Sequence, residues 1–194
     1  MNRTKRRIFN TAVKLFSSKG YDNTSVEEIT AIAGVAKGSL YYHFAKKEDI
    51  LYMLLEEGVK LLKNNIEIKT KKCNTATEKI RAIVLIEVKV VIKYEDFLNV
   101  IFSEMFGKEE INIKCKEAVI ECIKEIEKII QEGIDSHEFY NGNVEAMASG
   151  VFGVTCSSLI YRNRVDKILD VNDVYEGYAN AVINALKEKI KKER

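Results

Sequence analysis

The residues best suited to chemistry in this sequence lie close together near its N-terminal end. Val35, Leu40 and Phe44 are spaced so that a short helix could bury them on one side. The positions between them carry small, cationic or hydrogen-bonding groups: Lys37, Gly38, Ser39, Tyr41, Tyr42 and His43. A helix that is buried on one side and presents such groups on the other suits the major groove of DNA.

The preceding residues predict the element that positions this short helix. Val26, Ile29 and Ala33 recur at the spacing of one helical face. Thr24, followed three residues later by Glu27, predicts a capping box at the start of that helix. Gly34 supplies the backbone freedom for a sharp turn. The stretch 24–44 is therefore predicted to form a helix, a tight turn and a second helix.

The run TSVEEITAIAGVAKGSLYYHFAKKEDIL resembles the DNA-binding segment of the tetracycline-repressor (TetR) family. The resemblance covers about the first sixty residues, and the rest of the chain fits the family in length and helical character only. The matching residues are Gly20-Tyr21, Ala33-Gly34-Val35, Leu40-Tyr41-Tyr42-His43-Phe44 and Lys47-Glu48. The family usually has Ser at position 36 and Ser or Asn at position 46. Ala36 and Lys46 thus each remove a side-chain helix cap, worth about 1 kcal/mol.

The resemblance implies a set of DNA-contacting residues. Lys37 is expected at a base edge, because Lys can donate to guanine O6 and N7, whereas Lys47 and Tyr42 are expected at phosphates. Gly38 would let DNA approach the backbone, and the helix beginning at Thr24 and Ser25 could bind a phosphate oxygen. Core packing of the tyrosines and a structural hydrogen bond of His43 remain open alternatives. The full predicted set is Thr24, Ser25, Lys37, Gly38, Ser39, Tyr41, Tyr42, His43 and Lys47.

Hydrophobic periodicity predicts an all-α fold with two domains. A three-helix helix-turn-helix domain is expected at 1–60, and a larger helical domain for ligand binding and dimerisation at 61–194. The run IVLIEVKVVIK is rich in β-branched residues and could be a strand, but a buried helix is preferred. The predicted helices, besides the two of the motif, are 3–19, 45–68, 76–93 with a continuation to about 105, 109–133, 143–162 and 172–191.

The second domain is expected, by analogy with the family, to bind a small apolar or aromatic inducer that releases the operator. Plain core packing is the alternative for most of its aromatic residues. A DNA-binding scaffold whose second domain binds a protein partner, and a transcriptional activator, remain alternative functions. The candidate ligand-lining residues are Phe97, Phe102, Met105, Phe106, Phe152 and Tyr161.

Small residues in the last two predicted helices indicate a homodimer seam, because they let helices approach closely. Packing within one subunit is the alternative. A dimer would place two reading helices on a palindromic operator about 34–36 Å apart. The residues proposed for the seam are Ala146, Ala148, Ser149, Gly150, Gly153, Ser157, Ser158, Val174, Tyr178, Ala181, Val182 and Ala185.

Composition narrows the function classes. The net charge of the 194 residues is +2, but the first fifty contain nine basic and five acidic side chains, which favours polyanion binding there. No apolar run reaches the ~18 residues of a membrane span, and the basic N-terminus lacks a following apolar core, so a cytoplasmic location is expected. The sequence has only two histidines, His43 and His137, and no catalytic, metal-binding or phosphate-loop motif. We therefore expect no enzymatic activity, no cofactor and no metal site. The four unpaired cysteines are interpreted as buried hydrophobes, with a thiol sensor as the alternative.

Overall fold

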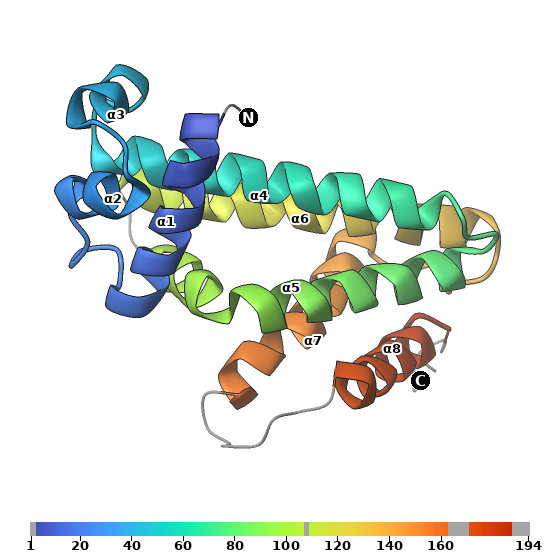
Figure 1. Cartoon of the computed structure of the whole chain (residues 1–194). Helices are drawn as coiled ribbons and strands as arrows, with labels where there is room; N and C mark the ends of the chain where they lie inside the picture. The colour runs from blue at the N-terminus through green and yellow to red at the C-terminus, as the bar shows by residue number, and fades with distance from the viewer. Residues whose placement is uncertain (1–2, 107–108, 163–170, 188–194) are drawn as a thin grey trace. The chain divides into compact units, whose positions relative to one another are not determined.

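The computed structural model describes residues 3–106, 109–162 and 171–187, and the regular secondary structure within these ranges is helical. The all-α prediction is confirmed, and the run IVLIEVKVVIK lies in α5. The helices, shown in Figure 1, are α1 (Arg3–Lys19), α2 (Val26–Ala33), α3 (Lys37–His43), α4 (Lys47–Thr70), α5 (Ala76–Glu104), α6 (Glu110–Asp135), α7 (Val144–Arg162) and α8 (Val171–Lys187).

The chain forms two compact units whose divisions fall inside long helices. Unit 1 comprises residues 1–60 and 94–119, and unit 2 comprises residues 61–93 and 120–194. One division coincides with Tyr94, where φ of −122° and ψ of 25° interrupt the helical geometry of α5. The functional boundary at residue 60 stays a prediction, because parts of α5 and α6 belong to the same compact unit as α1–α3.

The core of unit 1 holds the helix-turn-helix segment in place. The stripe on α1 is buried as its spacing predicts. Leu40 of α3 and Ile29 of α2 are fully buried in the same cluster, which Ile101 of α5 and Ile111 of α6 extend. The α1 residues of this core are Ile8, Ala12, Leu15 and Phe16.

The core of unit 2 is built from the β-branched residues of α5 and the inner face of α6. Burial outweighs the weak helix propensity of these side chains. The side chains that these two helices contribute to the core of unit 2 without exposed surface are Ile80, Ile83, Val84, Val88, Ile126 and Ile130.

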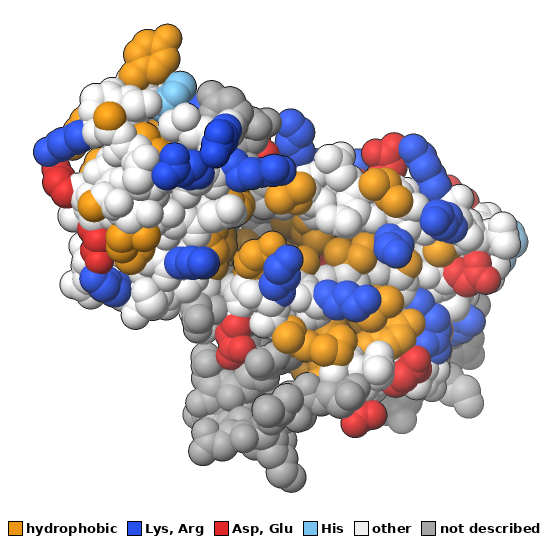
Figure 2. All heavy atoms as spheres, in the orientation of Figure 1, with side chains coloured by type: hydrophobic (Ala, Val, Ile, Leu, Met, Phe, Trp, Pro, Cys, Tyr) orange, Lys and Arg blue, Asp and Glu red, His pale blue; other side chains and the backbone are white. Residues whose placement is uncertain are grey.

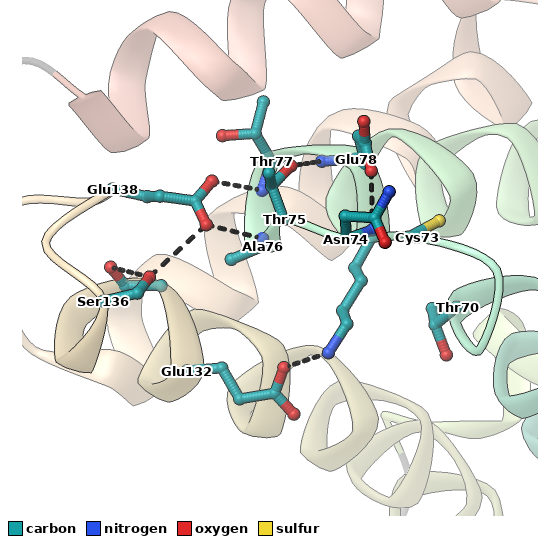
Figure 3. Close-up of polar contacts among 12 residues, drawn as sticks. Thr70, Cys73, Asn74, Thr75, Ala76, Thr77, Glu78, Glu132, Ser136 and Glu138 are labelled. Atoms are coloured by element: carbon teal, nitrogen blue, oxygen red, sulfur yellow. Dashed lines mark hydrogen bonds and ion pairs between the residues drawn. The ribbon is translucent and has the colours of Figure 1, made fainter.

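The start of α5 is fixed to the turn between α6 and α7, as Figure 3 shows. The Glu138 carboxylate accepts hydrogen bonds from the backbone amides of Ala76 at 2.8 Å and Thr77 at 2.9 Å. The Thr75 hydroxyl accepts from the Glu78 amide, as an N-cap does, and the Glu78 carboxylate accepts from the amide of Asn74, the residue before the cap. Free amides at the first turn of α5 are therefore satisfied by side chains.

Candidate DNA-binding surface

The first helix of the motif begins one residue later than the sequence indicated. The N-cap of α2 is Ser25, whose hydroxyl accepts from the Glu28 amide at 3.1 Å. The capping box predicted at Thr24 and Glu27 is wrong, because the buried Thr24 hydroxyl donates to the Gly20 carbonyl oxygen at 2.9 Å. Ser25 is therefore the exposed hydroxyl at the start of α2.

The turn between α2 and α3 depends on Gly34, as predicted. Its φ of 58° and ψ of 44° lie in the left-handed region, and the Val35 amide donates to the Thr30 carbonyl oxygen at 3.0 Å. A Cβ at position 34 would lie 2.5 Å from Nη2 of Arg7 on α1. Glycine at position 34 therefore allows the left-handed turn and leaves room for the Arg7 side chain beside it.

The second helix of the motif, α3, is buried on one side and exposed on the other. Leu40 has no exposed surface, whereas Lys37, Gly38, Tyr41 and Tyr42 are exposed. Ser39 and His43 are partly buried at the edges of the outward face, and the Tyr42 and His43 rings meet edge to face at 5.1 Å. Tyr42 is 85% exposed, so core packing does not explain this tyrosine.

Lys37 is held by an acidic residue that the sequence interpretation did not include in the site. Its Nζ lies 2.7 Å from Oε1 of Glu27 on α2, and 5.9 Å from the centre of the Tyr41 ring. The hydrogen bond from Lys37 lowers the pKa of Glu27, and the same bond raises the pKa of Lys37. Both groups are therefore charged at neutral pH, and Glu27 is placed to compete with DNA for the Lys37 ammonium.

Lys47 is engaged with the turn between α1 and α2. Its ammonium donates to the carbonyl oxygens of Tyr21 at 2.9 Å and Asp22 at 3.3 Å, and lies 4.3 Å from the centre of the Tyr21 ring. This side chain links the start of α4 to the turn before α2. A phosphate contact by Lys47 would share the ammonium with these carbonyl groups.

The two positions that differ from the family pattern have different consequences. Ala36 is the N-cap of α3 and makes no side-chain cap bond. At the start of α4, the Asp49 carboxylate instead accepts from the amides of Ala45 at 2.8 Å and Lys46 at 3.1 Å. The missing cap is thus replaced at α4 but not at α3.

Basic residues lie at the start of α1. Arg3, Arg6 and Arg7 are exposed, and Figure 2 shows Lys and Arg side chains gathered over this end of the helix. Lys5 lies 5.9 Å from the centre of the Phe44 ring, next to the end of α3. Unit 1 therefore has cationic side chains close to the outward face of α3, where DNA phosphates would lie.

The candidate ligand-lining residues are divided between the two units. Phe97 and Met105 pack against the core of unit 1, and Phe106 is 89% exposed. Phe102 is partly buried in unit 1, and Phe152 packs against the core of unit 2. The side chain of Tyr161 lies outside the described residues. A shared role in ligand binding stays a prediction for this set.

Other kinds of site find little support in the part of the chain that the structure describes. No group of three or more His, Cys, Asp and Glu side chains is arranged there to hold a metal ion. The same residues include no helix long and apolar enough to cross a membrane. Cys115 is buried, and burial followed by the nearby Glu104 charge raises its pKa to about 11, so its thiol is unreactive at neutral pH.

Comparison with known proteins identifies the class that this fold and surface define, a bacterial transcriptional regulator. Residues 8–52 match the family described as bacterial regulatory proteins, tetR family, and residues 59–188 match the QacR-like protein C-terminal region. The chain belongs to the TetR family of transcriptional regulators.

Several relatives carry more specific descriptions. The fatty acid metabolism regulator protein of Bacillus subtilis is 28% identical, over 76% of this chain and 77% of the relative. The IcaR negative regulator of the biofilm operon icaADBC in Staphylococcus epidermidis is 46% identical over 24% of this chain and 25% of its own length. The solved structure of FadR from Bacillus subtilis, in complex with stearoyl-CoA, has a TM-score of 0.84 at 22% identity, and the alignment covers 93% and 98% of the two chains.

Proposed function

We propose that this protein is a homodimeric repressor that binds a palindromic operator through α3 and is released by a small, mostly apolar ligand. The observation that carries the proposal is the outward face of α3, where Lys37, Tyr41 and Tyr42 are exposed above the buried Leu40. Members of the matching family bind DNA, and the relative IcaR is a negative regulator. Repression is therefore favoured over activation.

Each residue of the surface has a proposed role. Lys37 would donate to a base edge after leaving Glu27, and Tyr42 and Lys47 would donate to phosphates. Gly38 would allow close approach of DNA, since no atom of the described residues lies within 4 Å of where its Cβ would be. Ser25 begins α2, where free amides and the hydroxyl suit a phosphate oxygen, whereas the buried Thr24 would act by shaping the turn. Ser39, Tyr41 and His43 would complete the contacts of α3.

The dimer proposal is supported by the exposed small residues of α7 and α8. Among the described residues, no atom would lie within 4 Å of a Cβ added at Gly150, Gly153 or Gly177, so the described part of the chain leaves this side of the helices open. Ala148, Val151 and Val182, in contrast, are buried within unit 2 and belong to its own core. The small side chains that remain exposed along the two helices are Ala146, Ser149, Ser157, Ala181 and Ala185.

The ligand proposal follows from the apolar character of unit 2 and from the relatives. A relative at 28% identity regulates fatty acid metabolism, and a structural neighbour was solved with stearoyl-CoA. A molecule with a long apolar chain is therefore the proposed ligand class. Binding would favour a spacing of the two α3 helices that does not match the operator, which would release the DNA.

Selection of bound duplexes from a random pool tests the DNA-binding proposal. The expected result is an inverted repeat whose half-sites are about 34–36 Å apart. Selection of a single half-site, or no enrichment, would contradict it. Adding apolar compounds to the protein bound to the selected duplex then tests release separately.

Sedimentation tests the dimer independently. The expected species has about twice the 22.1 kDa mass of the chain. Gly153→Leu should weaken the dimer, because the larger side chain would hold apart helices that approach through small residues. Gly58→Leu is a matched control, since Gly58 is also an exposed helical glycine with open space beside it.

A further inference from the structure

The outward face of α3 has a carboxylate beside its cationic side chain. Glu27 of α2 lies 2.7 Å from the Nζ of Lys37, and both side chains are more than half exposed. The next residue, Glu28, instead pairs with Lys19 of α1. Glu27 is therefore placed at the surface that is proposed to contact base edges, whereas Glu28 is held on the side of α2 that meets α1.

A carboxylate at this place needs a new hydrogen-bond donor when DNA is bound. Phosphates repel it, and Lys37 leaves it when the ammonium turns to a guanine. The hydrogen bond from Lys37 lowers the pKa of Glu27, which is acidic even without this bond, so the group is ionised at neutral pH and can only accept hydrogen bonds. The donors that bases present in the major groove are the amino groups of cytosine and adenine.

The spacing of the two side chains matches the major-groove edge of a G·C pair. Lys37 is proposed to donate to the O6 and N7 acceptors of guanine, and the N4 atom of the paired cytosine lies one hydrogen bond, about 2.9 Å, from that O6. Oε1 of Glu27 lies at a similar distance, 2.7 Å, from the Lys37 ammonium. The ammonium, O6, N4 and Oε1 can therefore form a ring in which donors and acceptors alternate. An A·T pair does not present two adjacent acceptors followed by a donor.

We propose that Glu27 determines operator specificity together with Lys37, because its carboxylate accepts a hydrogen bond from the N4 amino group of the cytosine whose guanine partner Lys37 contacts. This inference rests on the proposed binding of an operator through α3, and it names one base pair of that operator. In the free protein Glu27 holds Lys37, which weakens binding to random duplex. The carboxylate regains a donor only where the duplex presents a cytosine amino group at this position, so the same residue favours the operator and disfavours other sequences.

N4-methylcytosine tests the contact, because its methyl group replaces the amino hydrogen that faces the major groove and leaves the pairing with guanine in place. The G·C pair to modify in the selected operator is the one whose exchange no longer changes the affinity of Lys37→Ala. Fluorescence anisotropy compares the unmodified and modified duplexes for the full-length wild type, Glu27→Ala and Glu28→Ala. The modified base should weaken wild-type binding about tenfold, whereas binding by Glu27→Ala, which lacks the acceptor, should change by less than about twofold.

Glu28→Ala removes the same charge from the same helix and is the matched control, so the modified base should weaken its binding as much as that of the wild type. Equal losses in the wild type and Glu27→Ala, or no loss in the wild type, would overturn the inference. A selected operator in which Lys37→Ala alters the preference at no G·C pair would also overturn it. Failure of the proposed function is a separate result, because the wild type would then enrich no duplex, and the inference would fall with it.

Discussion

Raising the pH should destabilise unit 2 through Glu87. Glu87 lies on α5, and burial in the core of unit 2 raises the pKa of its carboxyl group to about 8 in the folded protein, whereas the ordinary value is near 4.5. Below about pH 4.5 the group is protonated in both the folded and unfolded chain, and its contribution to stability is complete. As the pH rises toward 8, the unfolded chain loses the proton first, so the free energy of unfolding falls. Above about pH 8 the loss is complete.

The magnitude follows from the two pKa values. Each pKa unit corresponds to about 1.4 kcal/mol, so ionisation of Glu87 in the folded protein costs on the order of 5 kcal/mol. That is a large fraction of the roughly 5–15 kcal/mol by which a typical domain is stable. Glu87→Gln keeps the shape and the hydrogen bond with Thr155 of α7 but cannot ionise, so it should remove this pH dependence.

The assay is urea denaturation of the wild type and Glu87→Gln from about pH 5 to about pH 9, followed by circular dichroism. Other titrating groups are common to both proteins, so the difference in unfolding free energy isolates Glu87. The variant should gain stability relative to the wild type as the pH rises, by several kcal/mol in total. A difference that stays constant over this range, or that changes in the opposite direction, would refute the reasoning.

Five further substitutions test the DNA-binding unit and the start of α5. Lys37→Ala should weaken binding to the selected operator more than binding to random duplex. Lys47→Ala should weaken binding to both duplexes and also lower the melting temperature of the protein. Equal losses of affinity on both duplexes for both variants would contradict this division of roles. Glu27→Gln should strengthen DNA binding, as measured by fluorescence anisotropy, because Lys37 is freed; unchanged affinity would exclude competition. Gly34→Ala should cost about 1 kcal/mol of stability in urea denaturation because φ is positive, and no loss would contradict the strain. Glu138→Gln should lower the free energy of unfolding by about 1 kcal/mol above pH 5 and by less as the pH falls. Burial raises the pKa of the Glu138 carboxyl group, but hydrogen bonds from the Thr77 and Ala76 amides hold this pKa below its ordinary value. A loss of stability that does not change with pH would contradict a role for the Glu138 charge.

Local patterns predicted the helical elements well where one side of a helix is buried. The helix predicted at 3–19 has the bounds of α1. Asn143, at the start of the helix predicted at 143–162, caps α7 by accepting from the Ala146 amide at 2.7 Å. The capping box was misplaced because Thr24 with Glu27 and Ser25 with Glu28 fit the same pattern. The two alternatives differ in the structure only because the Gly20 carbonyl oxygen accepts a hydrogen bond from the Thr24 hydroxyl, which is then not available as a cap.

The contacts that tune the candidate sites depend on residues far apart in the sequence. Nothing in the sequence around Glu27 indicated that it pairs with Lys37. Lys47 reaches the Tyr21 and Asp22 carbonyl oxygens only because the start of α4 packs beside the turn between α1 and α2. The signal for Glu87 was present, as a single acidic residue within the apolar run IVLIEVKVVIK. Its hydrogen bond to Thr155, 68 residues later, could not be inferred from spacing.

The central claim is that the outward face of α3 reads DNA sequence. Equilibrium competition at physiological salt measures it most directly, with the selected duplex labelled and random duplex as competitor. The expected preference for the selected duplex is about a thousandfold or more. Equal affinity for the two duplexes would show that the protein binds only the phosphate backbone, and would contradict the account.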